Sequence, residues 1–262
     1  MTFELLVSSV GKDVKALADD MNIRSKAIII NQTDHFSYEE FEHNDKKIRA
    51  YSFNEKGVGL SRNNALMRAE GDIILFADED IVYEDDCEEK VLKAFNENPD
   101  ADMIMFNVEQ SKGRETYHID APGKVNRFNC GRYSAYSTAV RLEAVRKAGV
   151  TFSLLFGGGA KYSNGEDSLF IRQCIKSGFK CKAVPVNLGR ETERESTWFK
   201  GYNEKFFFDR GVLYSFLYGR AAYLWAFRFC FTKKKMICND IRWTKALKIM
   251  KEGMKEAHGK NR

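Results

Sequence analysis

The sequence predicts an α/β sandwich, in which helices cover both faces of a mostly parallel sheet. Between Phe3 and Val186, short apolar runs alternate with segments whose apolar residues recur at helical spacing. The run Ala27–Ile30 is apolar at every position, which is typical of a strand covered on both faces. A chain of 262 residues that is 44% hydrophobic can bury one large core and carry a C-terminal extension as well. Together these observations favour the α/β class.

The first half of the chain supplies most of the expected strands. Phe3–Val10 is an apolar run of strand length, and helical spacing follows it at Val14, Leu17, Ala18 and Met21. The other elements expected in this half are strands at Ala27–Ile30, Ile48–Phe53, Ile73–Phe76 and Met103–Val108, a helix around Arg62, and a helix at Asp85–Asn98 that Pro99 ends.

The second half begins with a polar stretch, 110–130, that predicts a loop or a small hairpin. A strand is expected at Tyr136–Val140, followed by a helix at Leu142–Ala148 that Gly149 closes. A further helix should open at Gly165 and run to Ser177, and a strand should return at Phe179–Val186.

The C-terminal part predicts a second unit, so we expect a catalytic domain at 1–210 and a basic, aromatic-rich helical extension at 211–262. Val212–Phe231 is apolar and aromatic. If it crossed a membrane as a helix, Arg220 would lie near the middle of the bilayer, and its insertion would cost roughly 2.5 to 3.5 kcal/mol. On one continuous helix Arg210, Arg220 and Arg228 would share an arc of about 80°. This pattern favours a helix that lies on an anionic lipid surface. The alternative is a helix packed on the catalytic core with its Arg exposed.

Charge and cysteine content narrow the class of protein. The net charge is +5, and the charges are unevenly distributed along the chain. Residues 78–89 hold eight Asp or Glu and no Lys or Arg, whereas residues 232–262 are mainly basic. Such a pattern suits an acidic cation site beside an anionic surface. The six Cys form no C-x-x-C pair, so a zinc site or a disulfide framework is not expected. We expect a cytoplasmic protein without a signal peptide, and we expect no nucleic-acid partner.

The stretch Asn54–Ile81 is the first candidate site. A Gly-containing loop leads into the helix that carries Arg62 and Asn63, and an apolar strand then ends on Asp78-Glu79-Asp80. Carboxylates at the C-terminal end of such a strand face solvent or a ligand. Two Asp one residue apart point the same way on an extended backbone. Their geometry suits one divalent cation that is held together with a phosphate-bearing substrate.

A second candidate site opens a helix at Gly165-Glu166-Asp167. Acids in the first turn of a helix are favoured by its dipole, which is a purely structural explanation of Glu166 and Asp167. The functional explanation is that one of the two carboxylates takes a proton from an attacking hydroxyl. The residues of this stretch alone do not choose between these explanations.

Both stretches resemble motifs of the family 2 glycosyltransferases. That family has roughly N-x-G-x-x-x-A-R-N-x-G and then a strand ending in D-x-D, which Asn54, Arg62, Asn63 and Asp78-Glu79-Asp80 match. Its later E-D-x-x-L/F-x-x-R motif is similar to Glu166-Asp167 with Phe170 and Arg172, and Asp80 and Asp167 are 87 residues apart. Ser61 and Leu66 depart from the pattern. The resemblance implies the Rossmann-like GT-A fold, a three-layer sandwich.

The resemblance also implies roles for individual residues. Asp167 would be the base, and Glu166 would be its neighbour or an acceptor contact. Asp80 would bind Mn²⁺ or Mg²⁺, while Asp78 would contact the metal or the ribose. Arg62 would stabilise the diphosphate or hold the base in place. The full set of residues expected to bind the nucleotide-sugar is Ser8, Asn31, Arg62, Asn63, Asp78 and Glu79.

Three segments depart from the family or extend it. Asn31 stands where the family usually has an Asp near the nucleoside. No His follows the last core strand as a further metal ligand, so Glu191, Glu193, Glu195 or water would have to take its place. The segment Ser196–Gly211 resembles one that lies beside the acceptor site in bacterial enzymes of capsule and exopolysaccharide assembly; the alternative is an aromatic-rich packing segment.

The function that these expectations define is inverting, metal-dependent transfer of a hexose or similar sugar. The donor would be a nucleoside-diphosphate sugar, with UDP as the expected nucleotide. The acceptor would be a saccharide hydroxyl, lipid-linked at the inner membrane face, in cell-surface polysaccharide biosynthesis. Two alternatives stay open. One is a sugar-phosphate nucleotidyltransferase, although Ser8–Asp13 contains a single Gly where a Gly-rich phosphate loop would be needed. The other is a non-catalytic membrane-associated protein that keeps the fold.

Overall fold

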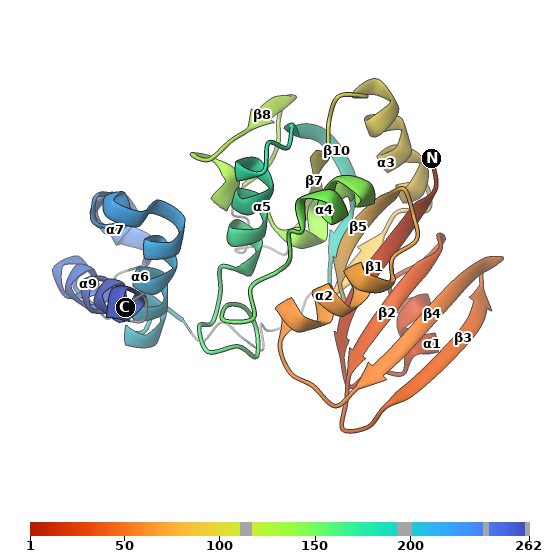
Figure 1. Cartoon of the computed structure of the whole chain (residues 1–262), viewed down its shortest axis with the longest axis horizontal. Helices are drawn as coiled ribbons and strands as arrows, with labels where there is room; N and C mark the ends of the chain where they lie inside the picture. The colour runs from red at the N-terminus through yellow and green to blue at the C-terminus, as the bar shows by residue number, and fades with distance from the viewer. Residues whose placement is uncertain (111–116, 193–200, 238–240, 260–262) are drawn as a thin grey trace.

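The expected three-layer α/β architecture is confirmed by a computed structural model that describes residues 1–110, 117–192, 201–237 and 241–259 (Figure 1). Its strands are β1 (Phe3–Val10), β2 (Ala27–Gln32), β3 (Ser37–His43), β4 (Lys46–Phe53), β5 (Ile73–Asp78), β6 (Ile81–Tyr83), β7 (Met103–Glu109), β8 (Gly123–Val125), β9 (Thr138–Arg141) and β10 (Cys181–Glu191). Its α-helices are α1 (Val14–Asp20), α2 (Val58–Arg68), α3 (Cys87–Glu97), α4 (Leu142–Ala148), α5 (Glu166–Lys176), α6 (Glu204–Tyr218), α7 (Ala222–Thr232), α8 (Lys234–Ile237) and α9 (Trp243–Gly259).

The strands form one sheet in the order β3-β4-β2-β1-β5-β9-β7-β10-β6, with β8 paired to β10. β4, β2, β1 and β5 run parallel, so their carboxyl ends meet at one edge. The register pairs Ser8 with Ile30 on one side and with Asp78 on the other. This edge therefore gathers the polar residues at the ends of β1, β2 and β5, as expected for a ligand site in an α/β sheet.

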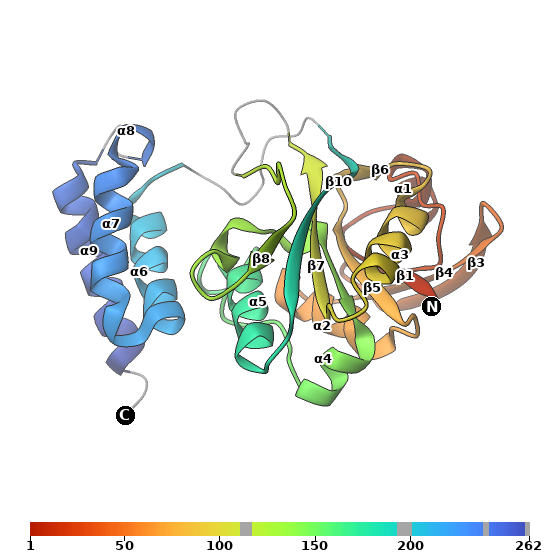
Figure 2. The same cartoon turned by 90° about the horizontal axis from the view of Figure 1, so that it is seen from above.

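Helices cover both faces of the sheet and bury two apolar clusters (Figure 2). One cluster holds Val14 and Leu17 of α1 together with Val91 and Phe95 of α3. The other cluster lies under α2, α4 and α5, with Phe170 among its fully buried residues. Apolar burial on both faces is why the central strands read as continuous apolar runs in the sequence.

Three strands, β3, β6 and β8, were not expected from the sequence. β8 lies in the stretch expected to be a loop or a small hairpin, and it pairs antiparallel with the start of β10. β3 reads Ser-Tyr-Glu-Glu-Phe-Glu-His and is mostly polar, because it is an edge strand that pairs only with β4. The turn that joins the two strands places Asn44 and Asp45 at positive φ, 49° and 57°. Asn and Asp tolerate this conformation in a two-residue hairpin. The short β6 pairs antiparallel with the end of β10, which extends β10 to Glu191, beyond its expected end at Val186.

The C-terminal helices form a third apolar cluster beside the sheet (Figure 1). α6 and α9 cross closely at two glycines. A Cβ on Gly211 would overlap the backbone carbonyl of Met250, and a Cβ on Gly253 would overlap that of Phe208. Phe156 and Tyr162, from the segment before α5, belong to this cluster as well. The cluster is thus packed against the region that leads into α5.

The expectation of one continuous helix over Val212–Phe231 is wrong. α6 ends at Tyr218, Gly219 takes a φ of 54°, and a short 3-10 turn leads into α7. The arc of three Arg side chains that a continuous helix would create therefore does not form. Arg210 instead lies over the rings of Phe206 and Phe229, at 5.1 and 5.2 Å from their centroids.

Candidate active site

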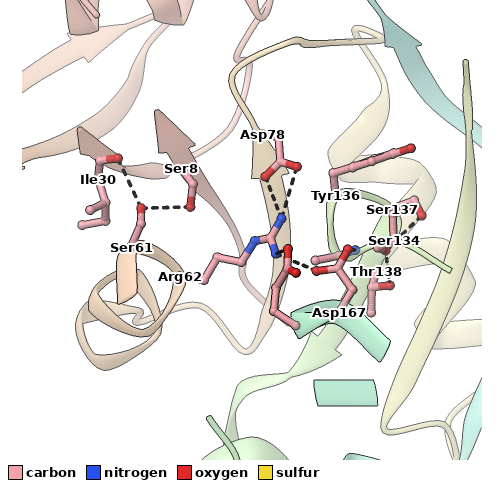
Figure 3. Close-up of polar contacts among 12 residues, drawn as sticks. Ser8, Ile30, Ser61, Arg62, Asp78, Ser134, Tyr136, Ser137, Thr138 and Asp167 are labelled. Atoms are coloured by element: carbon pink, nitrogen blue, oxygen red, sulfur yellow. Dashed lines mark hydrogen bonds and ion pairs between the residues drawn. The ribbon is translucent and has the colours of Figure 1, made fainter. Parts of the chain in front are cut away.

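Arg62 of α2 lies at the centre of a cluster of charged residues at the carboxyl edge of the sheet (Figure 3). Its side chain is 2% exposed. Nη2 donates to both carboxylate oxygens of Asp78, at 2.8 and 3.2 Å. Nη1 donates to Asp167 at 2.6 Å and to Glu166 at 3.2 Å. One planar guanidinium thus joins the end of β5 to the start of α5. Its N–H donors are fixed relative to one another, so the positions of the two carboxylates are fixed as well.

The packing of α2 on the sheet places Arg62 in this position. The Ser61 hydroxyl donates to Ser8 Oγ over 3.0 Å and is fully buried beside β1. Gly59, two residues earlier, lets the helix approach the chain at Ser153, because a Cβ on Gly59 would overlap the Ser153 carbonyl. Ser61, where the family pattern has a small Ala, therefore keeps the small size and adds a hydrogen bond. These contacts direct the next side chain, Arg62, between β5 and α5.

Glu166 and Asp167 occupy the first turn of α5. The helix begins after Gly165, whose φ of 116° favours glycine. Asp167 Oδ1 accepts from Arg62, and Asp167 Oδ2 accepts from the backbone N–H of Ala135 at 3.0 Å. Both carboxylate oxygens are therefore fixed from two directions, by a charged donor and by a backbone donor.

The electrostatics of the cluster follow from its burial. Burial lowers the pKa of Arg62, but the charges of Asp78, Asp167 and Glu166 outweigh burial and raise that pKa above its usual value. Burial and the neighbouring Asp167 charge raise the pKa of Glu166 to about 7, although Arg62 opposes the shift. Three carboxylates share one guanidinium, so the cluster carries excess negative charge.

Asp80 lies near this cluster, close to Asp78 and Glu191. Burial raises the pKa of Asp80 to about 6, and the negative charges of Asp78 and Glu191 add to this shift. Thr192 donates from its N–H and its hydroxyl to the Asp80 carbonyl, at 2.8 and 3.1 Å. The end of β10 is thereby held against the Asp78-Glu79-Asp80 turn. Of the three Glu considered as further metal ligands, Glu193 and Glu195 lie outside the described residues.

The structure gives three of the expected nucleotide-sugar residues contacts with the protein backbone. Asn63 uses both amide atoms on the backbone of Phe152, at 2.8 and 2.9 Å. Asn31 is buried, and its side-chain amide binds the backbone of Lys12. Its oxygen accepts from the Lys12 N–H at 3.1 Å, and its nitrogen donates to the Lys12 carbonyl at 2.8 Å. Glu79 accepts from the Val10 N–H at 2.8 Å and forms an ion pair with Lys12 at 3.5 Å. Asn31 and Glu79 thus shape the loop after β1.

Sequence reasoning missed three residues around the cluster. The Ala135 amide holds Asp167 through its backbone, so its side chain gave no signal. Gln32 accepts from the Gly57 N–H at 2.7 Å and fixes the start of α2. Gly157 has a φ of 107°, and a Cβ there would lie 2.9 Å from the Glu166 carboxyl carbon. The sequence Phe156-Gly157-Gly158-Gly159 was a visible signal for such a close approach.

The mostly parallel sheet with helices on both faces is the fold of the GT-A class of glycosyltransferases. Residues 34–146, somewhat under half of the chain, match the family model of glycosyl transferase family 2. Over these residues the chain is similar to that family, and its fold is the one that glycosyltransferases of the GT-A class have. No curated protein matched the chain in a sequence search.

Solved structures share the fold at low sequence identity. S. aureus TarS 1-349 in complex with UDP-GlcNAc aligns with a TM-score of 0.62 and 13% identity, over 92% of this chain and 74% of that one. The same TarS fragment without ligand gives 0.65 and 12%, over 97% and 81%. The mannosyltransferase PcManGT from Pyrobaculum calidifontis, in complex with GDP-Man and Mn²⁺, gives 0.53 and 12%, over 98% and 75%. At such identities the likeness establishes the fold alone.

Proposed function

We propose that this glycosyltransferase moves a sugar with inversion from a nucleoside-diphosphate sugar to a hydroxyl of a saccharide acceptor, in cell-surface polysaccharide biosynthesis. The observation that carries the proposal is the Arg62 bridge, which joins Asp78 at the end of β5 to Asp167 at the start of α5. In this assignment 1–210 is the catalytic domain and 211–262 an extension. The donor lies along the carboxyl edge of the sheet, and the acceptor approaches from the side of α5.

Asp167 is the catalytic base of the proposed reaction. It accepts the proton of the acceptor hydroxyl as that oxygen forms a bond to the anomeric carbon, while the bond from this carbon to the diphosphate oxygen breaks. Attack and departure on opposite faces invert the anomeric configuration, and no second nucleophile is needed. Arg62 and the Ala135 amide each engage one Asp167 oxygen, which leaves a further lone pair on each oxygen for the incoming proton.

Asp80 and Asp78 are the residues that would hold Mn²⁺ or Mg²⁺. The donor set fits a hard divalent cation, because Asp80 is a carboxylate that burial, and then the charges of Asp78 and Glu191, make costly to ionise without a cation; its pKa is raised for these reasons. Among the described residues no group of three His, Cys, Asp or Glu side chains could hold a metal. Two carboxylates with substrate phosphates are sufficient, however, for Mg²⁺ in phosphate-binding sites. When bound, the cation supplies Lewis-acid stabilisation of the departing diphosphate.

The nucleotide of the proposed donor is UDP. TarS has been solved with UDP-GlcNAc and with UDP, whereas PcManGT has been solved with GDP-Man. The UDP complexes of TarS are the reason for choosing UDP in this proposal, and the donor panel below tests it against GDP. Ser8, at the end of β1, lies beside Asp78 on the donor side of the cluster.

A panel of donors tests the proposal. Purified protein is heated with UDP, GDP, ADP and their sugars, with Mn²⁺ or with EDTA, and the release of nucleoside diphosphate is followed with saccharide acceptors. We expect stabilisation by uridine nucleotides with Mn²⁺, and transfer with inverted anomeric configuration by NMR. Retention of configuration would overturn the single-base mechanism, and stabilisation by guanosine nucleotides alone would overturn the donor assignment.

A further inference from the structure

The α7 helix presents an apolar face to solvent. Tyr223, Leu224, Phe227 and Phe231 are 46, 71, 44 and 51% exposed. At 100° per residue these four side chains fall within an arc of about 100°, so they form one stripe along the helix. The opposite side of α7, with Ala226 fully buried, packs into the C-terminal cluster. Helices of globular domains usually bury such a stripe, so a contiguous exposed one marks a contact site.

The surroundings of this stripe are basic. Residues 211–237 contain no Asp or Glu, and their charges are Arg220, Arg228 and the run Lys233-Lys234-Lys235. All five basic side chains are exposed. Lys234 lies over the Phe231 ring at 5.3 Å, so positive charge borders the apolar stripe directly. An aromatic and aliphatic stripe flanked by Lys and Arg is the pattern of helices that lie in the headgroup region of anionic bilayers.

No described helix is long and apolar enough to cross a bilayer. α7 has 11 residues, which is far shorter than the roughly 20 that a span requires. A helix with one apolar face, basic flanks and this length is suited to lie in the plane of the interface.

We propose that α7 docks this chain on an anionic lipid surface through Tyr223, Leu224, Phe227 and Phe231, with Lys233–Lys235 binding the headgroups. In Figure 2, α8 lies at the same end of the molecule as the carboxyl ends of β7 and β10. α8, which carries Lys234 and Lys235, therefore lies at the end of the molecule to which the carboxyl edge of the sheet, with its charged cluster, opens. This placement suits an acceptor carried on a lipid, and that last step alone rests on the proposed function.

Vesicle flotation with the full chain tests the docking. Vesicles of phosphatidylcholine alone are compared with vesicles that contain 30% phosphatidylglycerol, at low and high salt. We expect flotation with the anionic vesicles only, and its loss at high salt because exposed charges are screened. Equal binding to both vesicle types would overturn the role of the basic run. Binding to neither would overturn the proposal and leave an acidic protein surface as the occupant of the stripe.

Matched variants test whether binding to vesicles depends on the apolar stripe of α7 or on any exposed apolar side chain. Leu224→Gln is compared with Met67→Gln, because Leu224 and Met67 are 71 and 70% exposed and Met67 lies on α2, away from the C-terminal cluster. We expect Leu224→Gln to lower the vesicle partition coefficient by about tenfold, and Met67→Gln to leave it unchanged. Equal partitioning of the two variants would remove α7 from the contact.

A second matched pair tests the charge. The triple change Lys233→Gln, Lys234→Gln and Lys235→Gln is compared with the same change at Lys147, Lys176 and Lys180, which are exposed and lie within residues 1–210, outside the C-terminal helices. Both triples remove three charges, and each Lys near an anionic surface contributes about 1 kcal/mol, so the first triple should lose on the order of a hundredfold in partitioning. Equal losses would overturn the assignment of Lys233–Lys235. Donor hydrolysis by all variants should stay at the wild-type level, so a failure of docking is distinguishable from a failure of the enzyme.

Discussion

Arg62 donates to Asp167 over 2.6 Å from one nitrogen of its guanidinium, while the other nitrogen is bound to Asp78. The two carboxylates belong to elements that are far apart in the sequence, β5 and α5. The bridge therefore fixes the position of the proposed base relative to the donor side of the site. A change in either contact should affect the chemical step more than the binding of donor, since the base must lie within hydrogen-bond reach of the acceptor.

Arg62→Lys should separate these two effects. Lys keeps the positive charge, but a single ammonium cannot hold Asp78 and Asp167 in the geometry of a planar fork. We expect kcat to fall by about a hundredfold, which is the cost of misplacing a catalytic group by about 1 Å, with a smaller change in donor affinity. Arg24→Lys, at an exposed Arg paired with Asp85, is the matched control and should behave as wild type. Wild-type kcat in the Arg62→Lys variant would show that the bridge does not position the base.

Asp167→Asn tests the base itself. The amide can still accept from the Ala135 N–H, but it cannot take a proton, so kcat should fall by about 10² to 10⁴-fold. Donor-induced thermal stabilisation should persist in the variant, which shows that the site remains intact. A transfer rate within a few-fold of wild type would assign the base to another residue.

Much of the fold was readable because the buried strands carry an uninterrupted apolar signal. β1, β2, β5 and β7 lie between two helical layers, and each was expected from its apolar run. β3 was missed because an exposed edge strand has no apolar periodicity, and only its Asn44-Asp45 turn indicated a hairpin. The break between α6 and α7 had a local signal at Gly219, but the apolar content of the flanking residues outweighed it.

The candidate site was readable only in part. Asp78, Glu166 and Asp167 stand out as acids at the ends of elements, and the sequence order of the two motifs suggested that they meet. The Arg62 bridge had been one of two alternatives for that side chain. The Ala135 amide could not be found, because a backbone donor is defined by tertiary packing and not by residue type. The contacts of Asn63 with Phe152 were missed for the same reason, since its partner is also backbone.

The raised pKa of Glu166 predicts a pH dependence of stability. Its pKa is about 7 in the folded protein and lower in the unfolded chain, so the folded state favours the protonated carboxyl. This contribution to stability is present at low pH and is lost as the pH rises towards 7. Glu166→Gln, which stays neutral, should therefore gain stability relative to wild type as the pH rises from about 5 to about 7. Thermal melts across this range, with Glu143→Gln in the first turn of α4 as control, measure the difference. A pH-independent difference would contradict the shift.

Asp80→Asn tests the metal assignment. Wild-type protein should be stabilised by UDP more strongly with Mn²⁺ than with EDTA, because Asp80 and Asp78 would hold the cation and the cation would offset the charge of the diphosphate. Asp80→Asn should remove this Mn²⁺-dependent increment and keep the metal-independent part. Glu89→Gln, at an exposed acid of the same acidic stretch, should retain the full increment. An unchanged Mn²⁺ response in Asp80→Asn would exclude Asp80 as a ligand.

Gly253→Ala tests whether the close crossing of α6 and α9 stabilises the C-terminal cluster. The added Cβ would overlap the carbonyl oxygen of Phe208, and this oxygen belongs to the backbone of a helix that cannot move without shifting its neighbours. We expect a loss of about 1 to 3 kcal/mol in the free energy of unfolding, as for overpacked cores. Gly123→Ala is the control, because the nearest atom to its Cβ is 4.0 Å away, and it should change stability by less than about 0.5 kcal/mol. Denaturant unfolding of both variants measures the difference. Equal stabilities would mean that α9 can shift along α6, and the apolar stripe on α7 would then rest on a less rigid support than the structure indicates.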